Sequence, residues 1–166
     1  MTKIFGFAGW SGAGKTTLIR QVIARFVSEG LRVSTLKHAH HDFDIDHPGK
    51  DSWEHRKAGA SEVLVASDTR WALMHELAGA SEPSLTELLA RMSPADIVLV
   101  EGFKRSAIPK MEVFRADNGK PALHPDDDTI IAIASDTAFP EAGRRVLPLD
   151  DVAAIADFAR NHAQAA

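Results

Sequence analysis

The chain has 166 residues, of which 45% are hydrophobic, 25% charged and 7% aromatic, with no cysteine and a formal net charge of −4. These values exclude disordered, collagen-like and coiled-coil proteins, disulfides, thiolate metal sites and a globally basic surface for nucleic acid. No apolar run approaches the roughly 18 residues of a membrane span, and the N-terminus is unlike a signal peptide. We therefore expect a cytoplasmic protein with one domain over residues 1–166, and we expect neither nucleic acid nor membrane as a partner.

The predicted elements alternate between strands and helices. Residues 3–9 are mostly apolar and end in glycine, which is typical of a buried central strand. A glycine-rich turn, a helix that ends at Gly30 and a second strand over 31–38 follow. We also expect helices from Asp51 or Ser52 to about Gly59, from Ser84 to Met92 and over 150–163, and strands over 61–67, 70–77, 96–102, 110–115 and 129–135. This order predicts an α/β three-layer sandwich with a mostly parallel central sheet and some antiparallel strands.

Residues 9–16 fit the phosphate-binding pattern G-x-x-x-x-G-K-[ST] at every fixed position, between the first strand and the first helix. Glycines let successive backbone N–H groups converge on phosphate oxygens, and the positive end of the helix dipole points at the same anion. Lys15 would contact the β- and γ-phosphates, and Thr16 would offer its hydroxyl to Mg²⁺. The sequence therefore predicts a nucleotide-binding loop made of Gly9, Trp10, Ser11, Gly12, Ala13, Gly14, Lys15 and Thr16.

The second strongly apolar strand, over 96–102, carries a carboxylate close to its end. Glu101 would orient Mg²⁺ through water there, as the acid of a Walker-B strand does, because ligands bind at the carboxyl ends of parallel strands. An ordinary strand-end acid that faces solvent is the alternative. Beside a nucleotide-binding loop, we favour the magnesium role.

The loop after the second strand is rich in histidine and aspartate, and five of the eight histidines fall between residues 38 and 55. A loop in that position reaches the γ-phosphate side of a nucleotide-binding loop. There Asp42, Asp44 and Asp46 would hold Mg²⁺ or position a water. Imidazole and carboxylate groups also suit Zn²⁺ or Ni²⁺, and a solvated polar loop is the third interpretation.

Several motifs together resemble the MobB family of molybdopterin-guanine dinucleotide biosynthesis adapter proteins. They are GWSGAGKTTL, KHAHHDFDIDHPGKDSWEHRKAGA, VASDTRWALM, DIVLVEGFK with Ile108-Pro109-Lys110, and IAIASD, in order across nearly the whole chain. The resemblance implies a P-loop NTPase fold that binds GTP and Mg²⁺, forms a homodimer and is at most a slow GTPase. It also implies a partnership with a MobA-like guanylyltransferase, which joins GMP to molybdopterin, and points to molybdopterin as a second ligand.

Carried over residue by residue, the nucleotide-binding roles fall on Gly9 to Thr17 and the acidic-loop roles on Asp44 and Asp46. Glu101 takes the Walker-B role. The resemblance thus implies catalytic roles for Asp44, Asp46 and Glu101, and a Mg²⁺ site of Thr16, Asp46 and Glu101.

The N-K-x-D motif that reads guanine in ordinary GTPases does not occur in this sequence. If guanine is preferred, Asp136, at the end of the strand over 129–135, would accept hydrogen bonds from the N1 and N2 donors of the base. A helix-capping role for Asp136 is an equal alternative.

Two tryptophans receive different interpretations. Trp10 would cover the nucleotide or a dimer mate, whereas Trp71, inside an apolar strand pattern, is expected in the core. A basic stretch consists of Lys104, Arg105, Lys110, Arg115 and Lys120. It would bind a pterin phosphate or an acidic partner surface, or its charges are simply solvated.

Two other functions stay open from the residues alone. The fold also suits a small-molecule kinase, although only Arg144-Arg145 forms an arginine pair, far from a recognisable lid. The histidines suit a metal-delivery GTPase of the urease or hydrogenase maturation type.

Overall fold

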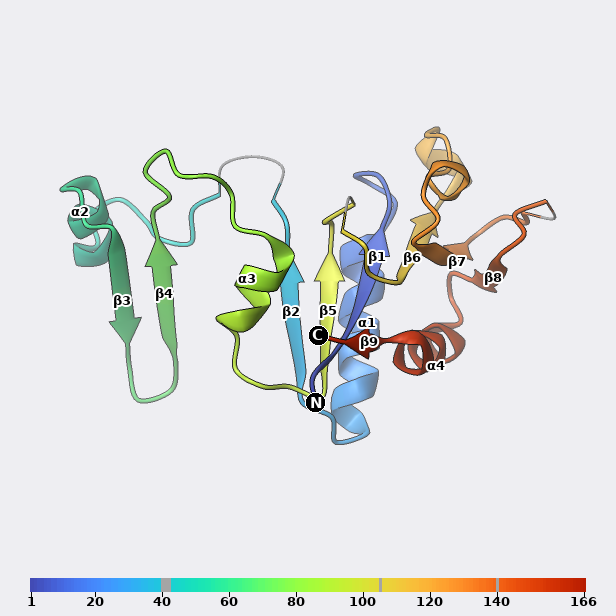
Figure 1. Cartoon of the computed structure of the whole chain (residues 1–166), viewed down its shortest axis with the longest axis horizontal. Helices are drawn as coiled ribbons and strands as arrows, with labels where there is room; N and C mark the ends of the chain where they lie inside the picture. Colours follow the sequence, from blue (N-terminus) through green and yellow to red (C-terminus); the bar gives the residue numbers. More distant parts are fainter. Residues whose placement is uncertain (40–42, 105, 140) are drawn as a thin grey trace. The chain divides into compact units, whose positions relative to one another are not determined.

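The computed structural model describes residues 1–39, 43–104, 106–139 and 141–166. The chain divides into two compact units, whose elements Figure 1 shows: unit 1 comprises residues 1–38 and 85–166, and unit 2 comprises residues 39–84. The single domain over residues 1–166 stays a prediction.

Unit 1 is built on one mixed sheet, to which seven strands contribute within the described residues. The pairings between neighbours in the main row are parallel, and only the short terminal strand, paired with β1, is antiparallel. The row runs β2 (Val33–Lys37), β5 (Ile97–Glu101), β1 (Lys3–Ala8), β6 (Lys110–Phe114), β7 (Ile130–Ser135) and β8 (Arg145–Pro148), with β9 (Gln164–Ala165) beside β1. The predicted α/β fold with a mostly parallel sheet is confirmed (Figure 1). Strands β8 and β9 were not predicted, since four and two residues give too short a pattern.

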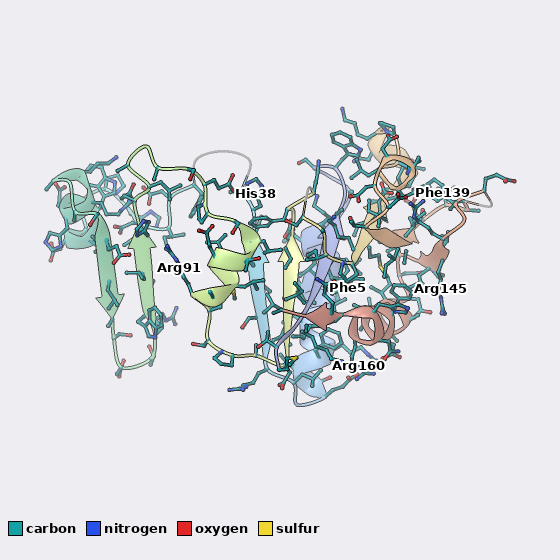
Figure 2. All side chains as sticks on the ribbon, in the orientation of Figure 1. Phe5, His38, Arg91, Phe139, Arg145 and Arg160 are labelled. Atoms are coloured by element: carbon teal, nitrogen blue, oxygen red, sulfur yellow. The ribbon has the colours of Figure 1, made fainter. Side chains whose placement is uncertain are left out.

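Helices cover both faces of this sheet. They are α1 (Lys15–Ser28), α3 (Leu85–Ala90) and α4 (Val152–His162). Helices α1 and α4 contact each other on one face, where the rings of Phe5 and Phe158 lie 6.3 Å apart (Figure 2). Helix α3 packs on the other face through Leu85. Because side chains alternate along a strand, Leu99 joins the first core and Val98 the second, which explains why β5 is apolar from Ile97 to Val100.

Unit 2 consists of one helix and a two-stranded antiparallel hairpin. Helix α2 (Asp51–Lys57) precedes β3 (Glu62–Ala66) and β4 (Trp71–His75). The strands pair around Asp68 and Thr69, as predicted, and α2 contacts β3. Within the described residues, no helix of the chain is long and apolar enough to cross a membrane.

Strand β6 carries two polar side chains that are fully buried, Lys110 and Glu112. The Lys110 ammonium donates to Ser106 O at 2.8 Å and to the Thr129 hydroxyl, and lies 3.4 Å from Asp127 Oδ2. Placing Lys110 in an anion-receiving basic stretch is therefore wrong, because its charge is buried and already paired. The face of β6 that carries Lys110 and Glu112 is not exposed to solvent, because Ser106 and residues 123–129 cover it.

Both carboxyl oxygens of Glu112 hold the chain segment that follows β6. Oε1 accepts from the Leu123 N–H at 2.7 Å, and Oε2 accepts from the His124 N–H at 2.9 Å, with His124 Nδ1 also 2.9 Å away. The segment contains two short 3₁₀ helices, η1 (Ala116–Asn118) and η2 (His124–Asp126). The buried acid thus fixes the path of a long connection between two central strands.

We expect Glu112→Gln to destabilise the protein by about 2 kcal/mol, because an amide NH₂ would face a backbone N–H in either orientation and leave buried groups unsatisfied. Urea unfolding followed by circular dichroism measures this change. Glu141→Gln, at an exposed position, is the control and should change the free energy of unfolding by less than about 0.5 kcal/mol. Equal stabilities of the two variants would contradict the structural role of Glu112.

The ion pair on Lys110 should make stability depend on acid pH. Burial by itself would raise the pKa of Asp127, but hydrogen bonds from Thr129 and the Lys110 ammonium outweigh burial and lower this pKa. The pair therefore contributes stability above the unfolded-state pKa of about 3.9, and this stability is lost as the pH falls through the lower folded-state pKa.

Accordingly, Asp127→Asn should be less stable than the unaltered chain at pH 7, and the difference should shrink as the pH is lowered to about 3. Urea unfolding at several pH values tests this. Asp128→Asn, on a fully exposed neighbouring side chain, controls for the change in net charge. A difference that stays constant with pH would overturn the assignment.

Candidate nucleotide-binding site

The loop over residues 9–14 has the backbone that a phosphate cradle needs. Gly9, Gly12 and Gly14 all have positive φ, of 142°, 85° and 91°. A Cβ on Gly9 would lie 2.5 Å from Val113 O of the neighbouring strand β6, so no larger residue fits there. Gly14 is the N-cap of α1 and has no side chain to cap the helix, which leaves the first N–H groups of α1 for an anion.

Lys15 already lies across this loop. Its ammonium donates to Gly9 O at 2.9 Å and to Trp10 O at 2.8 Å. Burial lowers the pKa of Lys15; Glu101 acts in the opposite direction, and Lys104 and Lys37 lower it further. The ammonium groups of Lys37 and Lys104 thus act on Lys15 at this edge of the sheet.

Thr16 and Glu101, two predicted magnesium residues, are brought together. Thr16 Oγ1 donates to Glu101 Oε1 at 3.3 Å, and Lys37 Nζ lies 3.5 Å from the same oxygen. Glu101 ends β5, which pairs with both β1 and β2, so Phe7 and Lys37 lie opposite it in the register. A hydroxyl and a carboxylate at this spacing form an oxygen donor set of the kind that Mg²⁺ prefers.

The segment after β6 braces the nucleotide-binding loop. Trp10 Nε1 donates to Pro121 O at 2.7 Å, and Asn118 Nδ2 donates to Ser11 O at 3.1 Å. A Cβ on Gly12 would lie 2.9 Å from Asn118 Oδ1. The connection that Glu112 anchors therefore fixes the outer side of the loop. Sequence reasoning missed Asn118, which carries no motif.

Asp136 has partners next to the loop. Its Oδ1 accepts from the Ala116 N–H at 3.0 Å, and its Oδ2 lies 3.8 Å from Arg115 NH1. The Arg115 side chain in turn lies beside Gly14, with Nε 3.2 Å from the position of a Cβ there. This geometry gives Asp136 a structural role at the start of η1, while its predicted contact with guanine stays a prediction.

The loop after β5 has a strained backbone. Gly102 has φ 89°, and Phe103 has φ 47°, which costs a bulky residue about 1 to 3 kcal/mol. The Phe103 ring packs against the second core and lies 5.0 Å from the His38 ring. The next residue, Lys104, holds its ammonium 4.4 Å from the centre of the Trp10 ring.

Asp44 and Asp46 belong to unit 2, and their described contacts are with residues of that unit. Both carboxylate oxygens of Asp44 accept from Arg56 NH2, at 2.7 and 2.9 Å, and these hydrogen bonds lower the pKa of Asp44. Asp46 Oδ1 accepts from Ser52 Oγ at 3.0 Å, and Oδ2 lies 3.6 Å from Arg56 Nε. Glu76 at the other end of the unit binds Arg56 as well, so one guanidinium organises the acidic loop. The catalytic roles of Asp44 and Asp46 stay predictions.

Four predicted residues, His40, His41, Asp42 and Arg105, lie outside the described residues. Among the described ones, no group of three or more histidine and acidic side chains is arranged to hold a metal ion.

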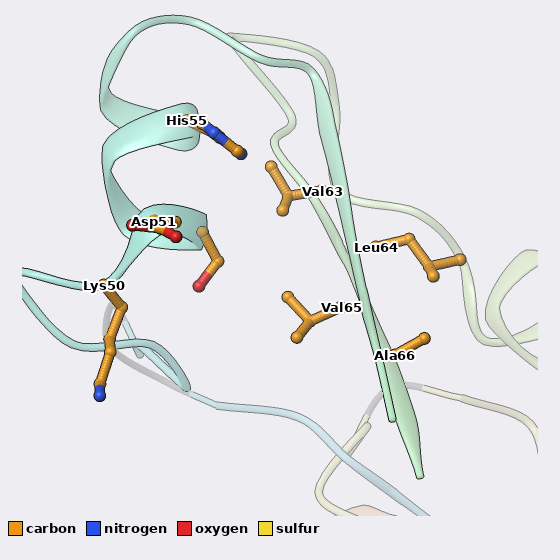
Figure 3. Close-up of a pocket in the computed structure, with 8 residues that line it drawn as sticks. Lys50, Asp51, His55, Val63, Leu64, Val65 and Ala66 are labelled. Carbon is orange, nitrogen blue, oxygen red and sulfur yellow. The ribbon is translucent and has the colours of Figure 1, made fainter. Parts of the chain in front are cut away.

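The two faces of the unit 2 hairpin differ. Figure 3 shows Val63 and Val65 directed toward α2, where they line a pocket with Lys50 and His55, and Leu64 directed to the other face. On that other face Leu64 is 60% and Trp71 64% exposed. The expectation that Trp71 lies in the core is therefore wrong. An apolar strand pattern shows that Trp71 belongs to an apolar face, but it does not show whether another part of the chain packs against that face.

The comparisons with known proteins agree across the chain. The family model described as MobB, Molybdopterin guanine dinucleotide synthesis protein B, matches residues 4–136. The chain is 45% identical over 161 residues to the molybdopterin-guanine dinucleotide biosynthesis adapter protein of Escherichia coli (strain K12), covering 95% of this chain and 91% of that one. It is 40% identical over 162 residues to the protein of the same name from Haemophilus influenzae, covering 95% and 88%.

Solved structures show the same fold. A crystal structure of molybdopterin-guanine biosynthesis protein B (mobB) superposes with a TM-score of 0.74 at 26% identity, over 93% of this chain and 96% of that one. The crystal structure of Bacillus subtilis MobB superposes with a TM-score of 0.75 over 99% of each chain, and at 23% identity it supports the fold alone. With a family model over most of its length and a relative at 45% identity, the chain belongs to the MobB family of molybdopterin guanine dinucleotide synthesis proteins.

Proposed function

We propose that this protein binds GTP with Mg²⁺ and acts as an adapter in molybdopterin guanine dinucleotide biosynthesis, where it assists a MobA-like guanylyltransferase. The observation that carries the nucleotide site is the joint geometry of the loop over 9–14, the Lys15 ammonium above it and the Thr16–Glu101 contact. The adapter role follows the names of the Escherichia coli and Haemophilus influenzae relatives.

The residues present fit a magnesium nucleotide. The N-terminal N–H groups of α1 and the Lys15 ammonium would bind the phosphates, and Thr16 and Glu101 would hold the metal. When bound, Mg²⁺ neutralises charge on the β- and γ-phosphate oxygens. Lys15 would exchange its two carbonyl acceptors for phosphate oxygens, so the cradle needs little rearrangement to bind an anion.

We propose that any GTP hydrolysis is slow and that the bound nucleotide mainly serves the adapter role. A slow hydrolysis would need a positioned water near Glu101, with Asp44 or Asp46 as further candidates. A guanine preference would use the carboxylate of Asp136, whose Oδ2 has only a long contact to Arg115.

Replacement of Lys15 tests the nucleotide site. Lys15→Ala should weaken GTP binding at least about 100-fold, because it removes a half-buried charged donor at the phosphate site. Isothermal titration with GTP and with ATP, in the presence of Mg²⁺, measures this. Lys3→Ala, at the opposite end of β1 and exposed, is the control. Unchanged GTP binding in Lys15→Ala would contradict the proposed nucleotide site.

The same titrations are repeated with a guanylyltransferase of the MobA type. Retention of the partner and tighter binding of GTP than of ATP would support the adapter role. A preference for ATP, no retained partner, or rapid phosphoryl transfer to a pterin or nucleoside would contradict it, the last in favour of a kinase.

We also propose that the protein is a homodimer that pairs through the hairpin of unit 2. A two-stranded sheet is marginally stable alone, and its outer edges are templates for another strand. The face that bears Leu64, Trp71 and Leu73 is apolar and exposed, as the cross-strand pairs Leu64–Leu73 and Ala66–Trp71 place these side chains together. A second copy of the same hairpin would cover this face with matching apolar groups.

The oligomeric state tests this interface. Leu73→Glu should convert the dimer to a monomer in sedimentation velocity or light scattering, because it places a charge in the apolar contact. Val27→Glu, an equally exposed apolar position on α1, should leave the dimer intact. A monomeric unaltered protein, or a dimeric Leu73→Glu variant, would contradict the interface.

A further inference from the structure

Lys104 lies against the nucleotide-binding loop although it comes from a different connection. The positive φ angles of Gly102 and Phe103 turn the chain back after β5, and the packed Phe103 ring fixes this turn. The Lys104 ammonium then rests 4.4 Å from the centre of the Trp10 ring, which is itself anchored by the hydrogen bond from Nε1 to Pro121 O. The main-chain carbonyl of the same Trp10 accepts from Lys15. Two ammonium groups are therefore held on one residue of the loop.

This arrangement gathers like charges beside the nucleotide-binding loop. Lys15, Lys37 and Lys104 supply three ammonium groups, and Glu101 supplies the carboxylate that contacts Lys37. Like charges repel, so an anion that binds beside these ammonium groups relieves their repulsion. A nucleoside polyphosphate is the anion that the glycine loop is shaped to take.

The position of Lys104 along the chain indicates which phosphate it meets. It follows Glu101 by three residues, and Glu101 with Thr16 would hold the metal of a magnesium nucleotide, so Lys104 lies on the side where the terminal phosphate would bind. Arg115 lies beside Gly14, at the start of α1, and pairs there with Asp136. A lysine has a flexible stem, so its ammonium can leave the Trp10 ring for a phosphate oxygen without a change in the backbone.

We propose that Lys104 binds the γ-phosphate and thereby makes the site prefer a nucleoside triphosphate to a diphosphate. In this role the Trp10 ring holds the ammonium in readiness while the γ-phosphate is absent. The inference rests on the proposed nucleotide binding, and its test separates the two.

The test compares affinities for a non-hydrolysable GTP analogue and for GDP, both with Mg²⁺, by isothermal titration. Lys104→Ala should weaken binding of the analogue about tenfold or more and change binding of GDP less than about twofold, because only the analogue carries the γ-phosphate. Lys104→Arg, which keeps the charge, should retain most of the preference. Lys3→Ala, an exposed lysine at the opposite end of β1, is the matched control and should alter neither affinity.

A spectroscopic readout follows Lys104 itself. In a Trp53→Phe, Trp71→Phe background, Trp10 is the only tryptophan that remains. Its fluorescence should change when the GTP analogue binds and draws the ammonium off the ring, and this change should be smaller with GDP and absent in the same background with Lys104→Ala.

The outcomes are distinct. If Lys104→Ala weakens the analogue and GDP by the same factor, Lys104 only supports the Trp10 ring, and the inference is overturned while nucleotide binding stands. The inference is overturned in the same way if neither affinity changes. If the unaltered protein binds neither GTP analogue nor GDP, the proposed function falls, and the role of Lys104 falls with it.

Discussion

The burial of Lys110 and Glu112 in the central strand β6 is the constraint from which much of the site follows. A charged or strongly polar group without exposure must be paired, since an unpaired one costs several kcal/mol. The partners are Ser106 and residues 123–129, which pack over β6 and supply these hydrogen bonds and the ion pair. The connection between β6 and β7 carries Pro121 O and Asn118, the groups that hold Trp10 and Ser11. The nucleotide-binding loop is thus braced from outside by a segment that a buried carboxyl group fixes.

The inner side of the loop is held by Lys15. Its ammonium satisfies two carbonyl groups that converge because three glycines adopt positive φ, and a Cβ on Gly9 would meet the carbonyl of Val113. Donor and acceptors are therefore in place before any anion binds, which lowers the cost of ordering the site on binding. With preorganisation of this kind, the affinity for an anion depends little on rearrangement of the backbone.

Local patterns predicted the parts of the molecule that local physics decides. The glycine spacing, the amphipathic helix after it and the apolar strand that ends at Glu101 needed only residues close in sequence, and the structure brings Thr16 and Glu101 within hydrogen-bond distance. The sequence did not show which faces of the strands would be covered by other parts of the chain. Lys110 was expected in a basic stretch that receives an anion but is buried, and Trp71, within an apolar strand, was expected in the core but is exposed. Each pattern shows which side chains share a face but not what lies on it.

The two predicted catalytic acids of unit 2 are chemically unequal, and Arg56 is the reason. Both oxygens of Asp44 accept hydrogen bonds from the guanidinium, so Asp44 can orient a water only through lone pairs that the ion pair already polarises. Asp46 gives Oδ1 to Ser52, while its Oδ2 is buried without a hydrogen-bond partner, 3.6 Å from Arg56 Nε. A buried oxygen without a donor is energetically unfavourable and gains most from a new donor such as a metal-bound water. Asp44 and Arg56 therefore hold the loop in shape, while Asp46 keeps one oxygen without a hydrogen-bond donor.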